Sequence, residues 1–359
     1  MRVVRAAAWF LACAAAVPVT AADWPRVEFR GTLTLPDEAA DAAGRPARIT
    51  GVSGVAWLGD DRYVAVLDNS DRLVFFAVRL GREGRPVAVR DLRVVRVGAV
   101  HDFEDVVVCP EAFRGPFATG RAEPGPCLLL AEEGTPAIRC VAQAGGELLG
   151  AVPLPEPLAR HRPNRGLESL SVDPDDGSIW TANEEALATD GPAAREGGGT
   201  TVRLVRLPPP AAAQRSARQY AYDVDPPHGF VRIFAGEPLA GVSAIAALGG
   251  GRLLVLERSA GPGLPPFTNR LYAVDTTHTA DVAAVDRDLA TWEGRRLEKR
   301  LVWQDALGCN LEGLCLGPPL PAGGRAAVAV ADNGGLDVPN RLIVLAVVPA
   351  PVPGGITSP

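Results

Sequence analysis

Short apolar runs that end in acidic or polar residues recur along most of the chain. They are typical of buried β-strands separated by turns, and no helical periodicity longer than a few turns competes with them. Aligned on their polar ends, the runs form five copies of a three-strand unit. The first strand recurs at 51–57, 102–108, 166–172, 241–247 and 310–316. The second recurs at 64–69, 128–133, 180–185, 254–259 and 328–333. The third recurs at 72–78, 137–143, 202–207, 269–275 and 340–346.

A fourth strand follows in four of the copies, at 87–97, 147–154, 218–224 and 298–304. The last copy lacks one, whereas the strand at 27–35 has no copy of its own to join. Four-stranded sheets repeated around an axis are the architecture of β-propellers. We therefore predict an all-β propeller of five four-stranded blades, closed by the N-terminal strand, with six blades only if an insertion hides one.

The N-terminus has the pattern of a secretory signal, with Arg2 and Arg5, an apolar run over 6–19 and small residues before Asp23. We predict a signal peptide over 1–22, a propeller domain over 23–348 and a Pro-rich tail over 349–359. No run is long and apolar enough to span a membrane. The sequence thus predicts a periplasmic or secreted protein. A lipoprotein anchored through Cys13 is less favoured, because the apolar stretch before Cys13 is very short.

The chain has a formal net charge of −6 and almost no lysine. An acidic protein without a basic run is a poor candidate for nucleic-acid binding, so no such partner is expected. The excess of carboxylates fits a bound cation instead.

Five cysteines remain after Cys13, and export permits disulfides. Cys109 and Cys127 flank a long Gly- and Pro-containing loop and are the best candidates for a disulfide. Cys309 and Cys315 lie at two ends of one predicted strand, roughly 20 Å apart, which is too far for a bridge.

The antiparallel pairing of first and second strands gathers acidic residues at one end of the channel. Because the first strand of each blade lines the channel, its mouth should hold Ser53, Glu104, Glu168, Ser243 and Glu312. The ends of the second strands should add another set, formed by Asp68, Glu132, Glu184, Glu257 and Asp332. Eight carboxylates at one rim repel one another, so they must bind cations, pair with arginines or stay partly protonated. Cation binding would make a calcium site, since Ca²⁺ takes several oxygen ligands in flexible geometry.

Ion pairs with arginines are an alternative to cation binding for these acids. Each third strand begins near an arginine on the same rim, and the five are Arg72, Arg139, Arg203, Arg270 and Arg341, spaced 67, 64, 67 and 71 residues apart. In any single blade, an ion pair between the acid and its own arginine is the favoured interpretation. Over the whole set the carboxylates outnumber what pairing needs, so we expect at least one bound cation.

The chain also resembles the phytase-like domain family, described by its esterase-like activity of phytase. The stretches that carry the resemblance are 51–54, 102–105, 165–170, 179–187, 220–222, 253–258, 310–313 and 332–333. The resemblance covers about 45–348 and implies a secreted propeller similar to alkaline phytases, which use Ca²⁺ in an acidic funnel to bind phosphate and activate water. It implies that Glu104, Glu168 and Glu312 act as inner ligands or bases. It also implies that Arg258 or the third-strand arginines hold phosphate.

The sequence predicts a monomeric, metal-dependent hydrolase that acts on a small phosphorylated or ester substrate, with Ca²⁺ as cofactor. Two alternatives stay open. One is a non-catalytic propeller that binds a ligand or a protein at the same rim. The other is a propeller lactonase or sugar dehydrogenase.

Overall fold

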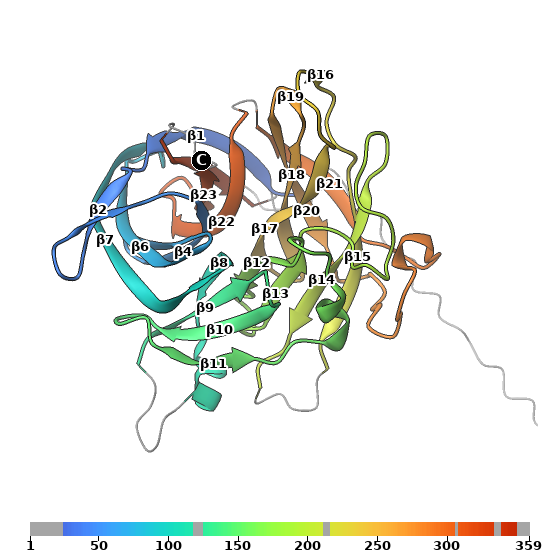
Figure 1. The fold of residues 1–359 in the computed structure, drawn as a ribbon, viewed down its shortest axis with the longest axis horizontal. Helices are drawn as coiled ribbons and strands as arrows, with labels where there is room; N and C mark the ends of the chain where they lie inside the picture. Colours follow the sequence, from blue (N-terminus) through green and yellow to red (C-terminus); the bar gives the residue numbers. More distant parts are fainter. Residues whose placement is uncertain (1–23, 118–124, 211–215, 306–307, 334–338, 350–359) are drawn as a thin grey trace, which may run out of the picture.

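The computed structural model describes residues 24–117, 125–210, 216–305, 308–333 and 339–349. Its strands form five main sheets that follow one another around a ring (Figure 1). The predicted all-β propeller of five blades is therefore confirmed. The proposed signal peptide over 1–22 and all but the first residue of the tail over 349–359 lie outside the described residues. Within the described ranges, no helix combines the length and the apolar character that a membrane crossing requires.

The inner strand of each blade borders the channel and contacts the inner strands of both neighbouring blades, so that the ring closes. The inner strands of blades 1 to 5 are β4 (Val52–Gly59), β8 (Phe103–Val108), β12 (Leu167–Val172), β17 (Leu239–Gly249) and β22 (Asn310–Pro319). The second strands are β5 (Arg62–Leu67), β9 (Cys127–Glu132), β13 (Ile179–Asn183), β18 (Arg252–Ala260) and β23 (Arg325–Asp332).

Two further strands complete each blade outward. The third strands are β6 (Ser70–Leu80), β10 (Ala137–Ala142), β14 (Thr200–Leu207), β20 (Phe267–Asp275) and β24 (Arg341–Val348). The fourth strands of blades 1 to 4 are β7 (Pro86–His101), β11 (Leu148–Val152), β15 (Arg218–Val224) and β21 (Glu298–Gln304).

The N-terminal strand β1 (Arg26–Thr34) is the outer strand of blade 5. It pairs antiparallel with β24, from Arg26 opposite Val348 to Thr34 opposite Arg341. The first and the last strand of the described residues thereby share one sheet, as the unassigned strand at 27–35 predicted. The hydrogen bonds of this pair hold the ring closed.

A few elements lie outside the repeat. In blade 1, β2 (Glu38–Asp41) and β3 (Pro46–Arg48) extend the sheet beyond β7, and β16 (Val231–Arg232) and β19 (Gly263–Leu264) form a separate pair. Helical segments are short, namely α1 (Glu111–Arg114), η2 (Gly115–Phe117), η3 (Glu156–Arg160) and η4 (Leu289–Thr291).

The apolar core is divided among the interfaces between blades. Five large clusters of buried side chains each join two neighbouring sheets, and the cluster between blades 5 and 1 combines Tyr63 and Phe76 with Val330 and Leu342. Every interface between neighbouring blades thus buries its own apolar surface.

Glycines let neighbouring blades approach closely beside the channel mouth. A Cβ at Gly54 would lie 2.3 Å from the Cα of Asp105 in the next blade, and one at Gly313 would lie 2.4 Å from the carbonyl oxygen of Ser53. These contacts involve backbone atoms, which cannot rotate away as a flexible side chain can.

Replacing Gly54 with Ala is expected to lower the free energy of unfolding by about 1–3 kcal/mol, because the added methyl group forces blades 1 and 2 apart. Urea denaturation measures the loss. Gly115→Ala is the matched control, since a Cβ there meets nothing within 4 Å. Equal stability of the two variants would contradict the close-approach argument.

None of the five cysteines in the described residues forms a disulfide. The bridge expected between Cys109 and Cys127 is therefore not formed in this structure. The two residues are nonetheless neighbours on adjacent strands, and the backbone N–H of Cys109 donates to the carbonyl oxygen of Cys127 at 2.9 Å.

Candidate metal centre

Every inner strand carries a register irregularity at its channel-mouth position. At each irregularity the inner strand has one residue more than the second strand that pairs with it. The residues at these five positions are Ser53 with Gly54, Glu104, Glu168, Ser243 and Glu312. A β-bulge turns the extra residue out of the regular alternation and re-aims its side chain. The five bulges thus bring three glutamates and two serines to the same level of the funnel.

The first carboxylate group joins blades 1 and 2. Asp68 follows β5, Asp102 precedes β8, and Glu104 lies at the bulge of β8. Each offers an oxygen that lies within 4.8 Å of the oxygens of the other two. Ser53 Oγ donates a hydrogen bond of 2.7 Å to Glu104 Oε2, which orients this carboxylate.

The second carboxylate group joins blades 2 and 3. Glu133 follows β9, Glu168 lies at the bulge of β12, and Glu184 follows β13. Their nearest ligand oxygens also lie within 4.8 Å of one another, and all three side chains are buried. The backbone N–H of Gly166 donates to Glu133 Oε1 at 3.0 Å.

Two arginines border the second group at Glu184, namely Arg258 from β18 of blade 4 and Arg165, which precedes β12 of blade 3. Arg258 Nη2 lies 2.5 Å from Glu184 Oε1, and its other terminal nitrogen contacts Glu312. Arg165 Nη1 lies 2.9 Å from Glu184 Oε2. One half of the mouth is therefore rich in carboxylates that form no ion pair within the described residues, namely Asp68, Asp102, Glu104, Glu133 and Glu168. Glu184 and Glu312 are paired with arginines.

Burial opposes ionisation in the carboxylate-rich half. It raises the pKa of Glu104 well above its ordinary value, and repulsion from Asp68 adds to the rise. Burial likewise raises the pKa of Glu168, with further repulsion from Glu104 and Glu184. Burial also raises the pKa of Glu133. A bound cation would remove this penalty, because it favours the ionised form of every surrounding carboxylate.

Two more acids at the mouth have a pKa raised to near neutral pH. Burial and a hydrogen bond with Asp68 raise the pKa of Asp102 to about 7. Burial raises the pKa of Glu312 to about 7 against the opposing charge of Arg258. Both groups exchange a proton in the range where a hydrolase commonly works.

Without a cation, the thermal stability of the protein is expected to fall as the pH rises from about 4 to about 7. Asp102 and Glu312 have a higher pKa in the folded protein than in the unfolded chain. Their stabilising protonation is therefore complete below the unfolded pKa values and is lost as the pH passes the folded ones. Melting curves recorded in chelator across this range check the sign. A melting temperature that rises through the window would contradict it.

The acidic set predicted at the ends of the second strands, here called the second ring, differs from the prediction in blades 2 and 4. In each blade, the inner-strand residue just before the bulge pairs with a residue of the second strand. The residues that follow these five partners in the sequence are Asp68, Glu133, Glu184, Arg258 and Asp332. Three of these match the predicted ring, whereas Glu132 and Glu257 lie one residue earlier, within their strands. A shift of one residue along a strand moves a side chain to the opposite face.

Glu132 and Glu257 accordingly have partners outside the two carboxylate groups. Glu132 Oε1 lies 2.8 Å from His101 Nδ1, and its other oxygen contacts Arg139. Glu257 accepts a hydrogen bond of 2.6 Å from Tyr222 Oη and lies 2.6 Å from Lys299 Nζ. Asp332 lies near enough to Glu312 to raise the pKa of that carboxyl further.

The third-strand arginines also have local partners. Arg72 donates to the carbonyl oxygen of Arg48 at 3.0 Å, and Arg270 Nη1 lies 3.8 Å from Asp225 Oδ2. Arg203 is buried against Asp190, and Arg341 Nη1 lies 3.6 Å from Cys309 Sγ. Among the described residues, none of the third-strand arginines is paired with a member of the two carboxylate groups.

Sequence reasoning missed three residues of the mouth, namely Asp102, Glu133 and Arg165. Asp102 lies two residues before Glu104, and Glu133 directly follows Glu132. Arg165 lies just before the strand that carries Glu168. Adjacent acids in the sequence were therefore a usable signal, but only the strand register distinguishes which of two neighbours faces the funnel.

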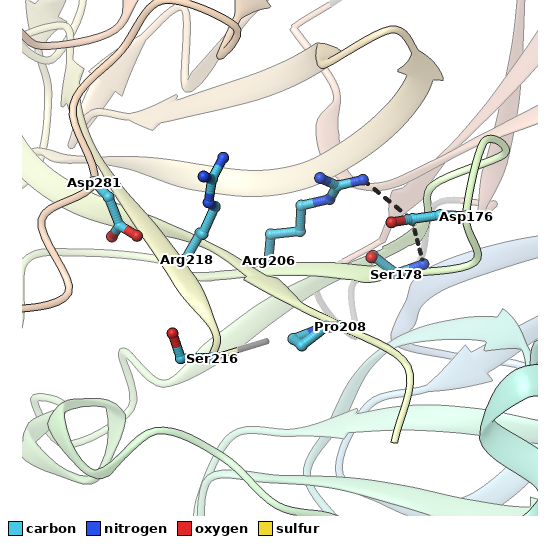
Figure 2. Close-up of a pocket in the computed structure, with 7 residues that line it drawn as sticks. All are labelled: Asp176, Ser178, Arg206, Pro208, Ser216, Arg218 and Asp281. Carbon is cyan, nitrogen blue, oxygen red and sulfur yellow. Dashed lines mark hydrogen bonds and ion pairs between the residues drawn. The ribbon is translucent and has the colours of Figure 1, made fainter. Parts of the chain in front are cut away.

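A separate pocket of about 520 Å³ lies on blade 3 and contains none of these carboxylates. Figure 2 shows Arg206 extended toward Asp176 along its wall. Arg206 Nη2 lies 3.1 Å from Asp176 Oδ1 and 2.9 Å from Asp173 Oδ2. Its charge is thus already compensated within the turn that joins β12 to β13.

Comparison with known proteins identifies a family and gives distant structural likenesses. A family model described as "Phytase-like: Esterase-like activity of phytase" matches residues 47–335. No curated protein sequence matches the chain. The periplasmic gluconolactonase PpgL of Pseudomonas aeruginosa is 12% identical, with a TM-score of 0.36, 91% of this chain covered and 97% of that one.

Two other solved structures are similar at the same level. A streptogramin B lyase structure is 11% identical, with a TM-score of 0.33, 90% of this chain covered and 99% of that one. A chain of the Chaetomium thermophilum Polycomb Repressive Complex 2 bound to GSK126 is 12% identical, with a TM-score of 0.38, 86% of this chain covered and 70% of that one. Likenesses this distant carry no argument about activity.

Proposed function

We propose that this chain, which belongs to the phytase-like family, is an exported calcium-dependent phosphoesterase that works at its acidic funnel. One observation carries the proposal. Two neighbouring groups of three carboxylates each have ligand oxygens within 4.8 Å of one another. Oxygen ligands around one Ca²⁺ lie about 2.3–2.6 Å from the ion, so two of them are at most about 5 Å apart.

The chemistry of the donor set also fits Ca²⁺. All ligands are carboxylate oxygens, which suit a hard cation, and no histidine or cysteine belongs to either group. Burial disfavours their ionised forms, and Arg258 and Arg165 contact Glu184, so the carboxylates of the two groups need further positive charge.

The residues have three proposed roles, which are to hold calcium, to bind phosphate and to exchange a proton. Asp68, Asp102 and Glu104 would hold one cation, and Glu133, Glu168 and Glu184 would hold another. Calcium bound there would offset phosphate charge and lower the pKa of a water molecule.

On the opposite side, arginine and glutamate side chains would meet the substrate. Arg258 and Arg165, fixed by Glu184, offer guanidinium groups for a phosphate. Glu312 has a pKa near 7 and would exchange a proton with the reacting group.

Export and the substrate class belong to the same proposal. The N-terminal pattern over 1–22 supports export, and a funnel bordered by arginines supports a small anionic ester. We expect the protein to act as a monomer, since one chain supplies every residue of both groups.

Assays of the purified mature chain on a panel of phosphomonoesters, with calcium and with chelator, test the proposal. Chelator-sensitive phosphate release is the expected result. Absence of release over a broad pH range would overturn the proposal. A calcium-dependent rise in melting temperature without turnover of any ester would then identify a binding module. Turnover of lactones, or redox activity with an added quinone, would identify the other alternative.

A further inference from the structure

Blade 2 contains a cluster of three cysteines far from the carboxylates in the sheet. Cys109 follows β8, Cys127 opens β9, and Cys140 lies in β10. All three are buried, and their sulfur atoms lie within 4.8 Å of one another. Three neighbouring strands thus present three sulfur atoms to one point.

The surroundings of the cluster are apolar. It belongs to the core between blades 2 and 3, where Phe113, Phe117 and Leu158 pack with the three cysteines. No carboxylate or imidazole of the described residues joins the group. A ligand bound there would meet the three sulfur atoms in apolar surroundings and, beside Cys109, the carbonyl oxygen of Pro110, which lies 3.6 Å from Cys109 Sγ.

One guanidinium group lies beside the cluster. Arg114 Nε donates to the carbonyl oxygen of Cys109 at 3.3 Å, which holds the guanidinium close to the three sulfur atoms. A positive charge beside thiols favours their thiolate forms, and the thiolate is the form that binds a metal.

A cavity of about 390 Å³ lies beside the cluster. Its wall combines the later parts of the inner strands, including Trp57, Leu170 and Leu314, with Cys109 and Arg114. The carboxylates lie at the beginning of the same strands, so this cavity is at the other end of the channel. The cysteine cluster is therefore near the end of the channel opposite the acidic mouth, with the Cys109 side chain itself buried.

We propose that Cys109, Cys127 and Cys140 form a three-sulfur binding site for Cu⁺. Soft thiolate ligands select Cu⁺, Zn²⁺ or iron–sulfur clusters. Zn²⁺ with three protein ligands needs a water or other fourth ligand, which apolar surroundings disfavour. Cu⁺ accepts three sulfur ligands. Two thiolates and one thiol around it leave a single negative charge, which Arg114 balances.

Proton release follows from this charge count. Coordination by two thiolates and one thiol releases two protons from three neutral thiols. The metal stays Cu⁺ throughout, so no oxidant or reductant takes part in the binding step.

Copper titration of the anaerobically reduced mature chain, in competition with a Cu⁺ chelator of known affinity, tests the site. One Cu⁺ per chain is expected. Cys140→Ser should weaken the affinity by at least about 10–100-fold, a loss comparable to that of removing a supporting residue around a metal. Cys309→Ser is the matched control, because Cys309 lies outside the cluster, and it should bind Cu⁺ as the wild type does.

Circular dichroism checks that the Cys140→Ser variant is folded. If it is not folded, Cys127→Ser is tested in its place. Absence of Cu⁺ binding by the reduced wild type, or wild-type affinity in folded cluster variants, would overturn the proposal. Peptide mapping under non-reducing conditions that finds a Cys109–Cys127 disulfide, together with no copper uptake after reduction, would do the same. The readout needs neither calcium nor ester hydrolysis, so it is independent of the proposed activity.

Discussion

Replacing Glu168 with Gln is expected to remove the contribution of one calcium site to the stability of the protein and to abolish its chelator-sensitive turnover. Glu168 is buried and lies within the carboxylate group formed with Glu133 and Glu184. At a calcium concentration 100 times the dissociation constant, one site stabilises the folded state by about 2.7 kcal/mol. The amide of Gln keeps the shape of the side chain but removes the negative charge that holds the ion.

The same substitution should not harm the metal-free protein. The neutral amide would no longer repel Glu104 and Glu184, so Glu168→Gln is expected to melt at the wild-type temperature or above it in chelator. This combination of a retained fold and a lost calcium response separates a ligand from a merely structural carboxylate. Thermal melts with and without calcium measure both quantities.

Glu132→Gln is the informative comparison. Glu132 ends β9 next to Glu133 in sequence, but its carboxylate lies against His101 and Arg139. We expect it to leave the calcium response unchanged while lowering stability modestly. If Glu132→Gln removes the response and Glu168→Gln does not, the assignment of the second group is wrong.

Replacing Asp190 with Ala is expected to destabilise the protein by about 3–5 kcal/mol, the cost typical of breaking a buried ion pair. The side chains of Asp190 and Arg203 are both fully buried, with Arg203 Nε 2.6 Å from Asp190 Oδ2. Arg203 also donates to Gln219 Oε1 at 2.9 Å. Without Asp190, the guanidinium stays in the core with hydrogen bonds to neutral partners only.

Denaturant unfolding measures this loss, and Arg341→Ala is its control. Arg341 occupies the same place in the repeat as Arg203 but is exposed, so its removal should change stability by less than about 0.5 kcal/mol. A loss below about 1 kcal/mol in Asp190→Ala would show that the pair contributes little, since breaking a buried pair typically costs several times more. The contrast would also show that arginines at one repeat position have unrelated roles.

Much of the fold was predictable from the sequence, because strand pattern and turns are local properties. Apolar runs that end at polar residues mark the strands, and the strand at 27–35 without its own copy indicated how the ring closes. The inner positions Glu104, Glu168 and Glu312 followed from the same repeat. Their convergence needs only the knowledge that each inner strand starts at one end of the channel.

The tertiary structure decided which acidic residues meet. The pairing of β8 with β9 and of β17 with β18 places Glu133 and Arg258, rather than Glu132 and Glu257, at the mouth positions. A side-chain period of two makes a single extra residue sufficient to reverse a face, and no composition or spacing reveals it. The same holds for Cys140, which joins Cys109 and Cys127 only because three strands align. The sequence by itself therefore determined the propeller and its acidic end, while contacts between strands decided the membership of each site.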